Sequence, residues 1–145
     1  MALLTFSVSS TASDMTAEHR VEDGVRFVTT ERRQPASPAA PNPLETLLAA
    51  LAGCMNVVAR MVAREMNLDL RRLTFVVEGS LDPRGMMGAP DVPPHFRTVS
   101  VRVTAEGDLT DAQVAALRAE VGRRCPVHRL FEAAGVVLDE SWGAA

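Results

Sequence analysis

The sequence predicts an α+β fold in a single domain of residues 1–145, and three observations lead to this prediction. The chain of 145 residues is long enough for one hydrophobic core but too short for two ordinary domains. Its composition, 47% hydrophobic and 23% charged, is typical of a soluble globular protein. Strand-like and helix-like segments follow in the order three strands, one helix, two strands, two helices and one strand.

The first part of the chain predicts a meander of three short strands at residues 4–10, 15–21 and 25–30. These segments carry β-branched and aromatic residues and are separated by turn signals such as an Asp-Gly pair. A connector rich in proline and alanine follows at residues 34–41. We expect it to lie within one domain.

A helix is predicted to begin at Asn42, where several start signals coincide. Asn42 is a suitable N-cap, Pro43 stands at the first helical position, and the carboxylate of Glu45 follows three residues after the cap. An apolar stripe continues at steps of three and four, formed by Leu44, Leu48, Leu51, Met55, Val58 and Val62. Cys54 belongs to a row beside this stripe, so we expect it on the apolar face of the helix.

The second half of the chain predicts the remaining elements. Strands are expected at residues 73–81, 96–105 and 136–138. Thr110 and Gln113 form a capping box that begins a helix extending to about Arg124. The proline after Cys125 starts a second, short helix that extends to about Ala134.

Composition excludes several classes of function. The formal charge is −3 without a basic face, so no nucleic-acid partner is expected. The sequence contains no lysine, which excludes Schiff-base and pyridoxal-phosphate chemistry. It also contains no tyrosine, which excludes a phenolic acid or base. The N-terminus lacks a basic region of the signal-peptide type, so a cytoplasmic location is expected. The most apolar stretch, residues 47–55, is too short to cross a bilayer, so no membrane partner is expected.

Cys125 is the better-activated thiol when judged by its neighbours in sequence. It precedes a helix start, where backbone N–H groups and the helix dipole favour a thiolate. Arg123 and Arg124 come directly before it. His128 and Arg129 follow about one helical turn later, where they return to the same side. The alternative is a buried, inert cysteine whose arginine neighbours face solvent, with His128 in a purely structural role.

Cys54, in contrast, has only apolar neighbours, and burial would raise its pKa. A reactive Cys54 would need an activating charge from elsewhere in the fold or from a second subunit. Glu45 is the obvious acidic candidate. However, nine helical positions place it about 13 Å along the axis and on the opposite side, so capping also accounts for it. A zinc site at Cys54, Cys125 and His128 is a weaker alternative, because only one short ligand spacing is present. A cysteine protease with His128 as the base is weaker still.

Two motifs resemble a known family. The segment from Asn42 to Cys54, NPLETLLAALAGC, closely resembles the first-cysteine helix of OsmC/Ohr-like proteins. The segment CPVHR, which begins at Cys125, resembles the second-cysteine motif of the same family. The resemblance covers nearly the whole chain, including the order of strands and helices. It implies an OsmC-like fold in an intertwined homodimer, with sheets from both subunits packed around two central helices.

The resemblance also implies a chemistry. In characterised members the first cysteine attacks an organic hydroperoxide and the second resolves the product. Cys54 would then be the peroxidatic cysteine and Cys125 the resolving one, which reverses the order suggested by their neighbours. The expected partners are an organic hydroperoxide and an external dithiol reductant, which in the family can be a lipoylated protein. The expected role is defence against oxidative stress, and neither cofactor nor metal is required.

The sequence departs from the characterised peroxidases at two points and thus resembles a less-characterised branch. Those enzymes place a catalytic glutamate directly after the proline of the first motif, where this chain has Leu44 and carries Glu45 one position later. They also use an arginine near the first hairpin to activate the thiolate. None of the nearby arginines falls on that position; they are Arg20, Arg26, Arg32 and Arg33.

The sequence is therefore consistent with three functions. A peroxidase at Cys54 and Cys125, with Glu45 as the acidic candidate, is favoured because both cysteines are retained. A non-catalytic protein that binds a small hydrophobic molecule is favoured by the two departures. A redox sensor would form the disulfide but turn over slowly. The methionine and leucine surroundings of Cys54 favour alkyl or fatty hydroperoxides as substrates.

Overall fold

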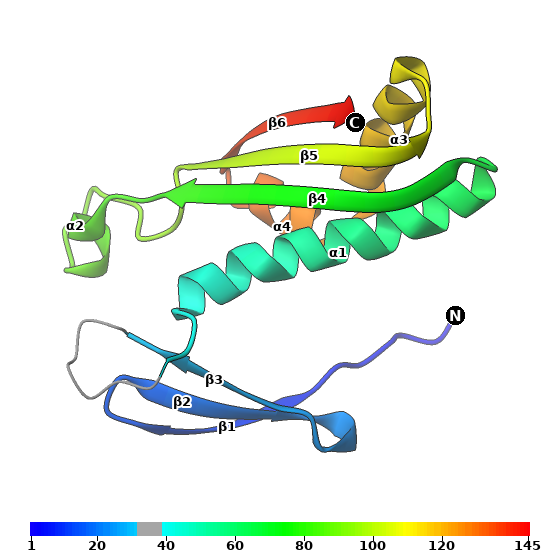
Figure 1. Cartoon of the computed structure of the whole chain (residues 1–145). Helices are drawn as coiled ribbons and strands as arrows, with labels where there is room; N and C mark the ends of the chain where they lie inside the picture. The colour runs from blue at the N-terminus through cyan, green and yellow to red at the C-terminus, as the bar shows by residue number, and fades with distance from the viewer. Residues whose placement is uncertain (32–38) are drawn as a thin grey trace. The chain divides into compact units, whose positions relative to one another are not determined.

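A computed structural model describes residues 1–31 and 39–145 of the chain. Within these residues it contains two three-stranded sheets and the helices α1 to α4 (Figure 1). The chain separates into two compact units, Met1–Leu47 and Leu48–Ala145. Each unit is described by itself.

The first unit is an antiparallel meander in the order β1-β2-β3. Its strands are β1 (Val8–Ser13), β2 (Thr16–Val21) and β3 (Arg26–Thr30). Asp14 adopts a positive φ of 51° in the turn between β1 and β2. A 3-10 turn, η1 (Glu22–Gly24), joins β2 to β3, and Gly24 supplies the φ of 78° that a left-handed turn requires. The predicted meander is confirmed.

The position of β1 corrects the prediction. The apolar residues from position 4 onward predicted a strand at residues 4–10, but the strand begins at Val8 and ends at Ser13. The tight turn after Ser13 pairs it with Thr16, and this pairing sets the register of the whole hairpin. Leu4 and Phe6 fall before the strand and remain more than 80% exposed in the single chain.

α1 (Pro43–Glu65) begins with the predicted cap. The side-chain oxygen of Asn42 accepts a hydrogen bond of 2.7 Å from the backbone N–H of Leu44. The carboxylate of Glu45 accepts one of 2.8 Å from the backbone N–H of Asn42. These two bonds satisfy N–H groups that a helix start otherwise leaves without partners.

The sides of α1 differ in exposure. One side is buried and includes Leu51, Met55, Val58, Ala59, Val62 and Ala63. The guanidinium of Arg60 donates to the carbonyl oxygens of Leu70 and Arg71 at 2.6 and 3.1 Å, which ties the helix to the chain that follows. By length and composition alone, the 23 residues of α1 could cross a membrane, although the core helix of a soluble protein passes the same test. The prediction that α1 is a core helix rather than a membrane span stays a prediction.

The second sheet has the order β4-β5-β6, with β5 central. Its strands are β4 (Asp69–Ser80), β5 (Thr98–Asp108) and β6 (Val137–Ala144). β4 and β5 are antiparallel, whereas β5 and β6 are parallel. Alternate residues of β5 are buried, as the predicted alternation requires, and these are Val99, Val101, Val103 and Ala105. The short helix α2 (Pro83–Met86) lies in the connection between β4 and β5.

The last two helices meet at Cys125. α3 (Asp111–Arg124) begins with the predicted capping box of Thr110 and Gln113. α4 (Pro126–Ala133) follows at once, so Cys125 is both the C-cap of α3 and the N-cap of α4. α3 contacts both α4 and β6. The predicted order of elements is confirmed, and the hydrophobic core of this unit lies between the buried side of β5 and the helices.

Candidate active site

Folding brings Cys54 and Cys125 together, although they are far apart in the sequence. The thiol of Cys54 lies close enough to Cys125 to raise the pKa of its thiol, and both cysteines are free. Cys54 is partly exposed on α1, whereas Cys125 is completely buried at the junction of α3 and α4. The site therefore combines a partly exposed thiol with a buried thiol close to it.

The surroundings of Cys125 keep it protonated. Burial raises the pKa of its thiol from 9.0 to about 11, and the neighbouring Cys54 adds to this rise. The backbone N–H groups of His128 and Val127, in the first turn of α4, face the sulfur and act in the opposite direction. Burial outweighs them, so at neutral pH Cys125 is a thiol and not a thiolate.

This result corrects the interpretation of Cys125 as the better-activated thiol. The basic side chains beside it in sequence face carboxylates instead of the sulfur. The pairs are Arg123 with Glu120, Arg124 with Glu65, Arg129 with Glu132, and His128 with Glu140. Sequence spacing gave the correct helix positions, but it could not show that each position faces an acidic partner. The side chain of His128 in particular is not a base for either thiol.

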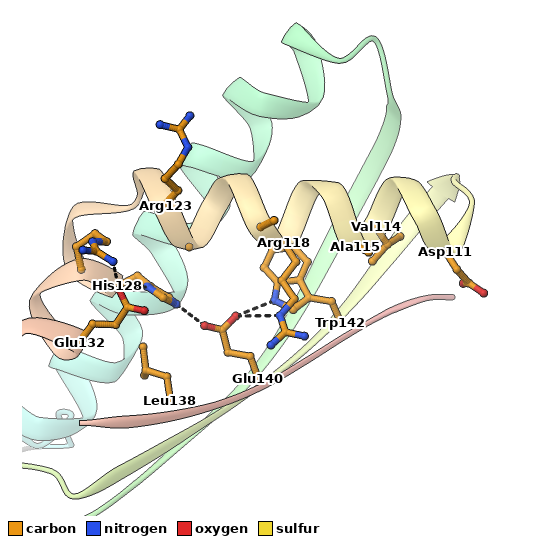
Figure 2. A pocket seen from close by; sticks show the side chains of 13 residues that line it. Asp111, Val114, Ala115, Arg118, Arg123, His128, Glu132, Leu138, Glu140 and Trp142 are labelled. Atoms are coloured by element: carbon orange, nitrogen blue, oxygen red, sulfur yellow. Dashed lines mark hydrogen bonds and ion pairs between the residues drawn. The ribbon is translucent and has the colours of Figure 1, made fainter. Parts of the chain in front are cut away.

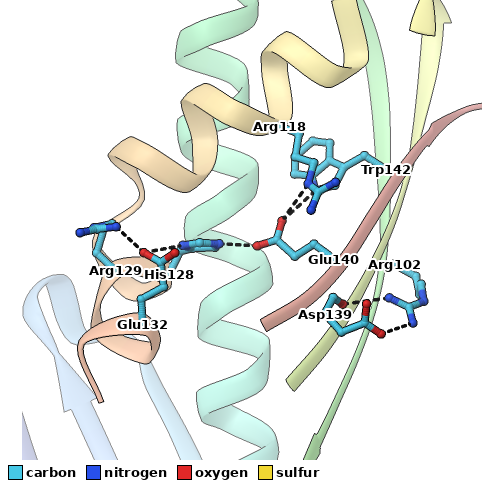
Figure 3. A network of polar contacts seen from close by, with 8 residues as sticks. All are labelled: Arg102, Arg118, His128, Arg129, Glu132, Asp139, Glu140 and Trp142. Atoms are coloured by element: carbon cyan, nitrogen blue, oxygen red, sulfur yellow. Dashed lines mark hydrogen bonds and ion pairs between the residues drawn. The ribbon is translucent and has the colours of Figure 1, made fainter. Parts of the chain in front are cut away.

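His128 and Glu140 form a buried bridge that the sequence did not reveal (Figure 3). The Nε2 atom of His128 is hydrogen-bonded to the Oε1 atom of Glu140, and the two side chains are only 5% and 7% exposed. The indole N–H of Trp142 donates to the other carboxylate oxygen at 3.2 Å. Arg118 on α3 lies 3.8 Å from the same oxygen.

The charges around Glu140 favour its ionised form. Burial raises the pKa of its carboxyl group, but the hydrogen bond and charge of His128 oppose this, together with Trp142 and Arg118. The net effect is a lowered pKa. The other imidazole nitrogen, Nδ1 of His128, is buried and has no hydrogen-bond partner among the described residues. The nearest carboxylate to it is Glu132, at 3.7 Å.

A cavity of about 680 Å³ opens beside this bridge, between α3, α4 and β6 (Figure 2). His128, Glu140 and Trp142 line it, and Arg118 lies at its side. Neither cysteine lines this cavity. Strand alternation could have indicated that Glu140 and Trp142 share one side of a strand, although it does not indicate that His128 meets them. The predicted strand ended at residue 138, so this alternation was missed.

The remaining candidates have different surroundings. Glu45 is occupied at the helix cap, and its catalytic assignment stays a prediction. Arg20 and Arg26 lie in the sheet of the first unit. Arg32 and Arg33 lie outside the described residues. Arg60, on the same helix as Cys54, is directed toward backbone carbonyl groups.

Two of the alternatives can be compared with this geometry. Within residues 48–145, no arginine donates a hydrogen bond to Cys54, so this unit of a single chain does not itself supply the activating cation that a peroxidatic thiolate requires. The zinc site would need Cys54, Cys125 and His128 to converge, but the imidazole of His128 is directed to Glu140. In the described part of the chain, no group of three or more His, Cys, Asp or Glu is arranged to hold a metal ion.

Comparisons with known proteins agree on one family. A family described as OsmC-like protein matches residues 35–141, which span both cysteines. No curated protein sequence matches the chain significantly.

Solved structures show the same fold at low sequence identity. An OsmC-like protein from Mycoplasma pneumoniae superposes with a TM-score of 0.84 at 15% identity, covering 98% of both chains. An organic hydroperoxide resistance protein OsmC from Legionella pneumophila gives 0.71 at 20%, covering 100% of this chain and 99% of that one. The organic hydroperoxide resistance protein OhrB of Bacillus subtilis gives 0.69 at 19%, covering 98% and 100%.

Proposed function

Since this chain belongs to the OsmC-like family, we propose that it is a thiol-dependent peroxidase that reduces organic hydroperoxides in defence against oxidative stress. One observation carries this proposal: an accessible thiol, Cys54, lies beside a buried second thiol, Cys125. The names of the Legionella and Bacillus proteins as hydroperoxide resistance proteins support it. We place this chemistry in the cytoplasm, where free thiols are the usual state of paired cysteines.

In the first step, the thiolate of Cys54 attacks the distal oxygen of the hydroperoxide. The O–O bond breaks, the alkoxide leaves and takes up a proton to become an alcohol, and the sulfur becomes a sulfenic acid. Cys54 suits this role because it is partly exposed, and a substrate can therefore reach its sulfur. Cys125 does not suit it, because it is buried and its pKa is raised to about 11.

In the second step, Cys125 attacks the sulfenic sulfur of Cys54. An S–S bond forms, and the hydroxyl group of the sulfenic acid leaves with the thiol proton of Cys125 as water. The raised pKa of Cys125 is compatible with this step because its proton has an acceptor in the leaving group of its neighbour. An external dithiol then reduces the disulfide by thiol exchange and restores both thiols.

Apolar side chains continue on the exposed side of α1 on which Cys54 lies. Leu47, Val57 and Met61 are 42%, 58% and 48% exposed in the single chain. Together with Ala50 and Cys54 they follow steps of three and four, which place them on one stripe of the helix. This stripe supports a preference for hydroperoxides with an alkyl group, because the alkyl tail gains by leaving water.

The same stripe supports a homodimer. Large apolar side chains in a regular row on a long helix are typical of a face that packs against another helix. We propose that a second copy of the chain covers part of this row and supplies the charge that activates Cys54, in an intertwined arrangement of two sheets and two central helices. Glu45, the acidic candidate from the sequence, is bound at the cap of α1, and the prediction that separates capping from catalysis is given below.

The activity test measures peroxide consumption with an excess of dithiol. The wild type should consume cumene hydroperoxide faster than hydrogen peroxide. Cys54→Ser should lower the rate at least about a hundredfold, and Cys125→Ser should turn over more slowly than the wild type, because the external dithiol must then attack the sulfenic acid of Cys54 directly. Leu130→Ser, an exposed position on α4, is the control that should keep the wild-type rate. Slow consumption that is equal in all variants would refute the peroxidase.

A second candidate is a non-catalytic protein that binds a small hydrophobic molecule with the apolar row of α1. The specific observations that favour it are Leu44 at the position of the family's glutamate and the lack of an arginine hydrogen-bonded to Cys54 among residues 48–145. This candidate predicts that Cys54→Ser leaves binding of an apolar fluorescent probe unchanged while no variant consumes peroxide.

A further inference from the structure

The backbone and the side chain of His128 serve two different neighbours. Its backbone N–H group, in the first turn of α4, faces the sulfur of Cys125. Its imidazole bridges to Glu140 on β6 (Figure 3). One residue therefore links the strand directly to the turn that surrounds the buried thiol.

Several contacts fix the position of the His128–Glu140 bridge. Glu140 is bound by His128 at one oxygen and by Trp142 at the other, with Arg118 of α3 nearby. A carboxylate buried to this extent is costly to leave without its partner. On α3, a Cβ atom at Gly122 would lie 3.5 Å from the Cε1 atom of His128, so the imidazole also lies close against that helix. The charged groups that face it are thus Glu140 from β6 and Glu132 from α4 itself, with Arg118 of α3 behind Glu140.

α4 needs such an anchor because it is short. Its eight residues form about two turns, and a helix of this length is not stable without tertiary contacts. Only His128 and Phe131 of α4 are buried, and its other side chains are partly or fully exposed. His128 is the anchor nearest to Cys125.

We propose that His128 is a positioning residue for Cys125, acting through its buried bridge to Glu140, which holds the first turn of α4 against β6. The bridge keeps the Cys125 sulfur buried and directed at Cys54, so that the two sulfurs are already positioned to form a disulfide. This inference deepens the proposed function and rests on it for its biological meaning. Its tests use no peroxide, so they can fail or succeed independently of the peroxidase activity.

The first test measures the equilibrium of the Cys54–Cys125 disulfide in glutathione buffers. In His128→Leu the bridge is lost, and we expect the protein disulfide to be about tenfold easier to reduce, because the effective concentration of one thiol near the other falls. His128→Gln retains an N–H donor close to the position of Nε2. It should remain within about twofold of the wild type.

The second test measures the reactivity of Cys125 alone, in a Cys54→Ser background. The rate of alkylation as a function of pH should have its midpoint well above 9.0 when His128 is present, because burial, which does not depend on Cys54, is the main cause of the raised pKa. In His128→Leu the midpoint should move down toward 9.0, since burial is the main cause of the raised value. The His128→Gln variant should retain the high midpoint.

Two controls separate positioning from general stability. Asp139 is the neighbour of Glu140 in β6, but it forms an exposed pair with Arg102, so Asp139→Asn should change neither readout (Figure 3). Leu117→Ala opens a cavity in the buried side of α3 and lowers stability without touching the bridge. If it shifts both readouts as much as His128→Leu, or if His128→Leu shifts neither, the positioning role is overturned.

Discussion

At the scale of single residues, the two cysteines differ in what surrounds them and not in their neighbours along the chain. The arginines beside Cys125 suggested an activated thiolate, yet burial dominates and raises its pKa to about 11. Cys54 has apolar neighbours in sequence, but it is the thiol that solvent can reach. The sequence identifies both cysteines, but their neighbours in sequence do not show which thiol is more reactive, because burial is a property of the folded chain.

This difference predicts selective modification. At pH 8 only about one Cys125 molecule in a thousand is a thiolate, since its pKa lies about three units higher. We therefore expect iodoacetamide to label Cys54 first, with Cys125 protected until pH 10 or above. Peptide mass spectrometry after timed labelling at pH 8 checks this prediction. Equal labelling of both cysteines in the folded protein would contradict the described burial.

The raised pKa also has a consequence for stability. A thiol whose pKa is higher in the folded state than its ordinary 9.0 favours folding below pH 9.0, and this contribution is lost as pH rises to about 11. We expect the free energy of unfolding to fall by about 2 kcal/mol over this window. Urea unfolding at a series of pH values measures it, and Cys125→Ala should show a shallower decline.

Glu45 is the residue whose role the sequence left open, and its hydrogen bond to the N–H of Asn42 accounts for it as a cap. We therefore expect Glu45→Gln to lower the free energy of unfolding by less than about 1 kcal/mol and to leave peroxide consumption unchanged. Thermal unfolding and the peroxide assay measure the two effects. A loss of activity of more than tenfold, with stability retained, would restore the catalytic assignment.

At the scale of elements, the sequence predicts correctly the features that local geometry decides. The caps at Asn42 and Thr110 occur as predicted, because they depend on residues within one turn. The alternation of β5 is also confirmed, because one side of it is buried. The start of β1 was wrong because its side chains are exposed, and only the turn at Asp14 sets its register.

The bridge of His128 to Glu140 lay beyond what the sequence could show. It joins a helix to a strand that follows it in the chain, and the pairing depends on how α4 packs against β6. Neither residue has a periodic or motif signal that indicates the other. Local patterns therefore predicted the elements and both cysteines, whereas the contacts that surround Cys125 required the tertiary structure.

One glycine of the second sheet should tolerate no side chain without a loss of stability. A Cβ atom at Gly107 would lie 1.8 Å from the carbonyl oxygen of Asp69, next to the register shift between β4 and β5. We expect Gly107→Ala to destabilise the protein by at least about 2 kcal/mol, because backbone must move. Gly143→Ala, where nothing lies within 4 Å, should change stability little. Similar urea midpoints for the two variants would argue against this register.

At the scale of the whole molecule, the proposed homodimer would account for the exposed apolar row of α1. The apolar row of α1 remains exposed in a single copy, and Cys54 lies within it. A second copy would both bury the row and enclose the site. The prediction of one domain over residues 1–145 stays a prediction, since the chain separates into two compact units.

The proposed dimer predicts the effect of charge in this row. We expect Val57→Arg and Met61→Arg to convert the protein from dimer to monomer, because a guanidinium would have to be buried without a partner. Leu130→Arg, on exposed α4, is the matched control and should leave the dimer intact. Sedimentation velocity measures the mass in solution. A wild type that sediments as a monomer would contradict the proposed dimer.

The proposal that Cys54 and Cys125 form a redox pair within one chain is tested most directly by intact-mass and peptide analysis after one equivalent of cumene hydroperoxide. We expect the reduced protein to lose two hydrogen atoms per chain, with a single disulfide that links the Cys54 peptide to the Cys125 peptide. We also expect Cys125→Ser to stop at a trappable sulfenic acid on Cys54. Two thiols that both remain free and alkylatable after peroxide treatment would contradict it.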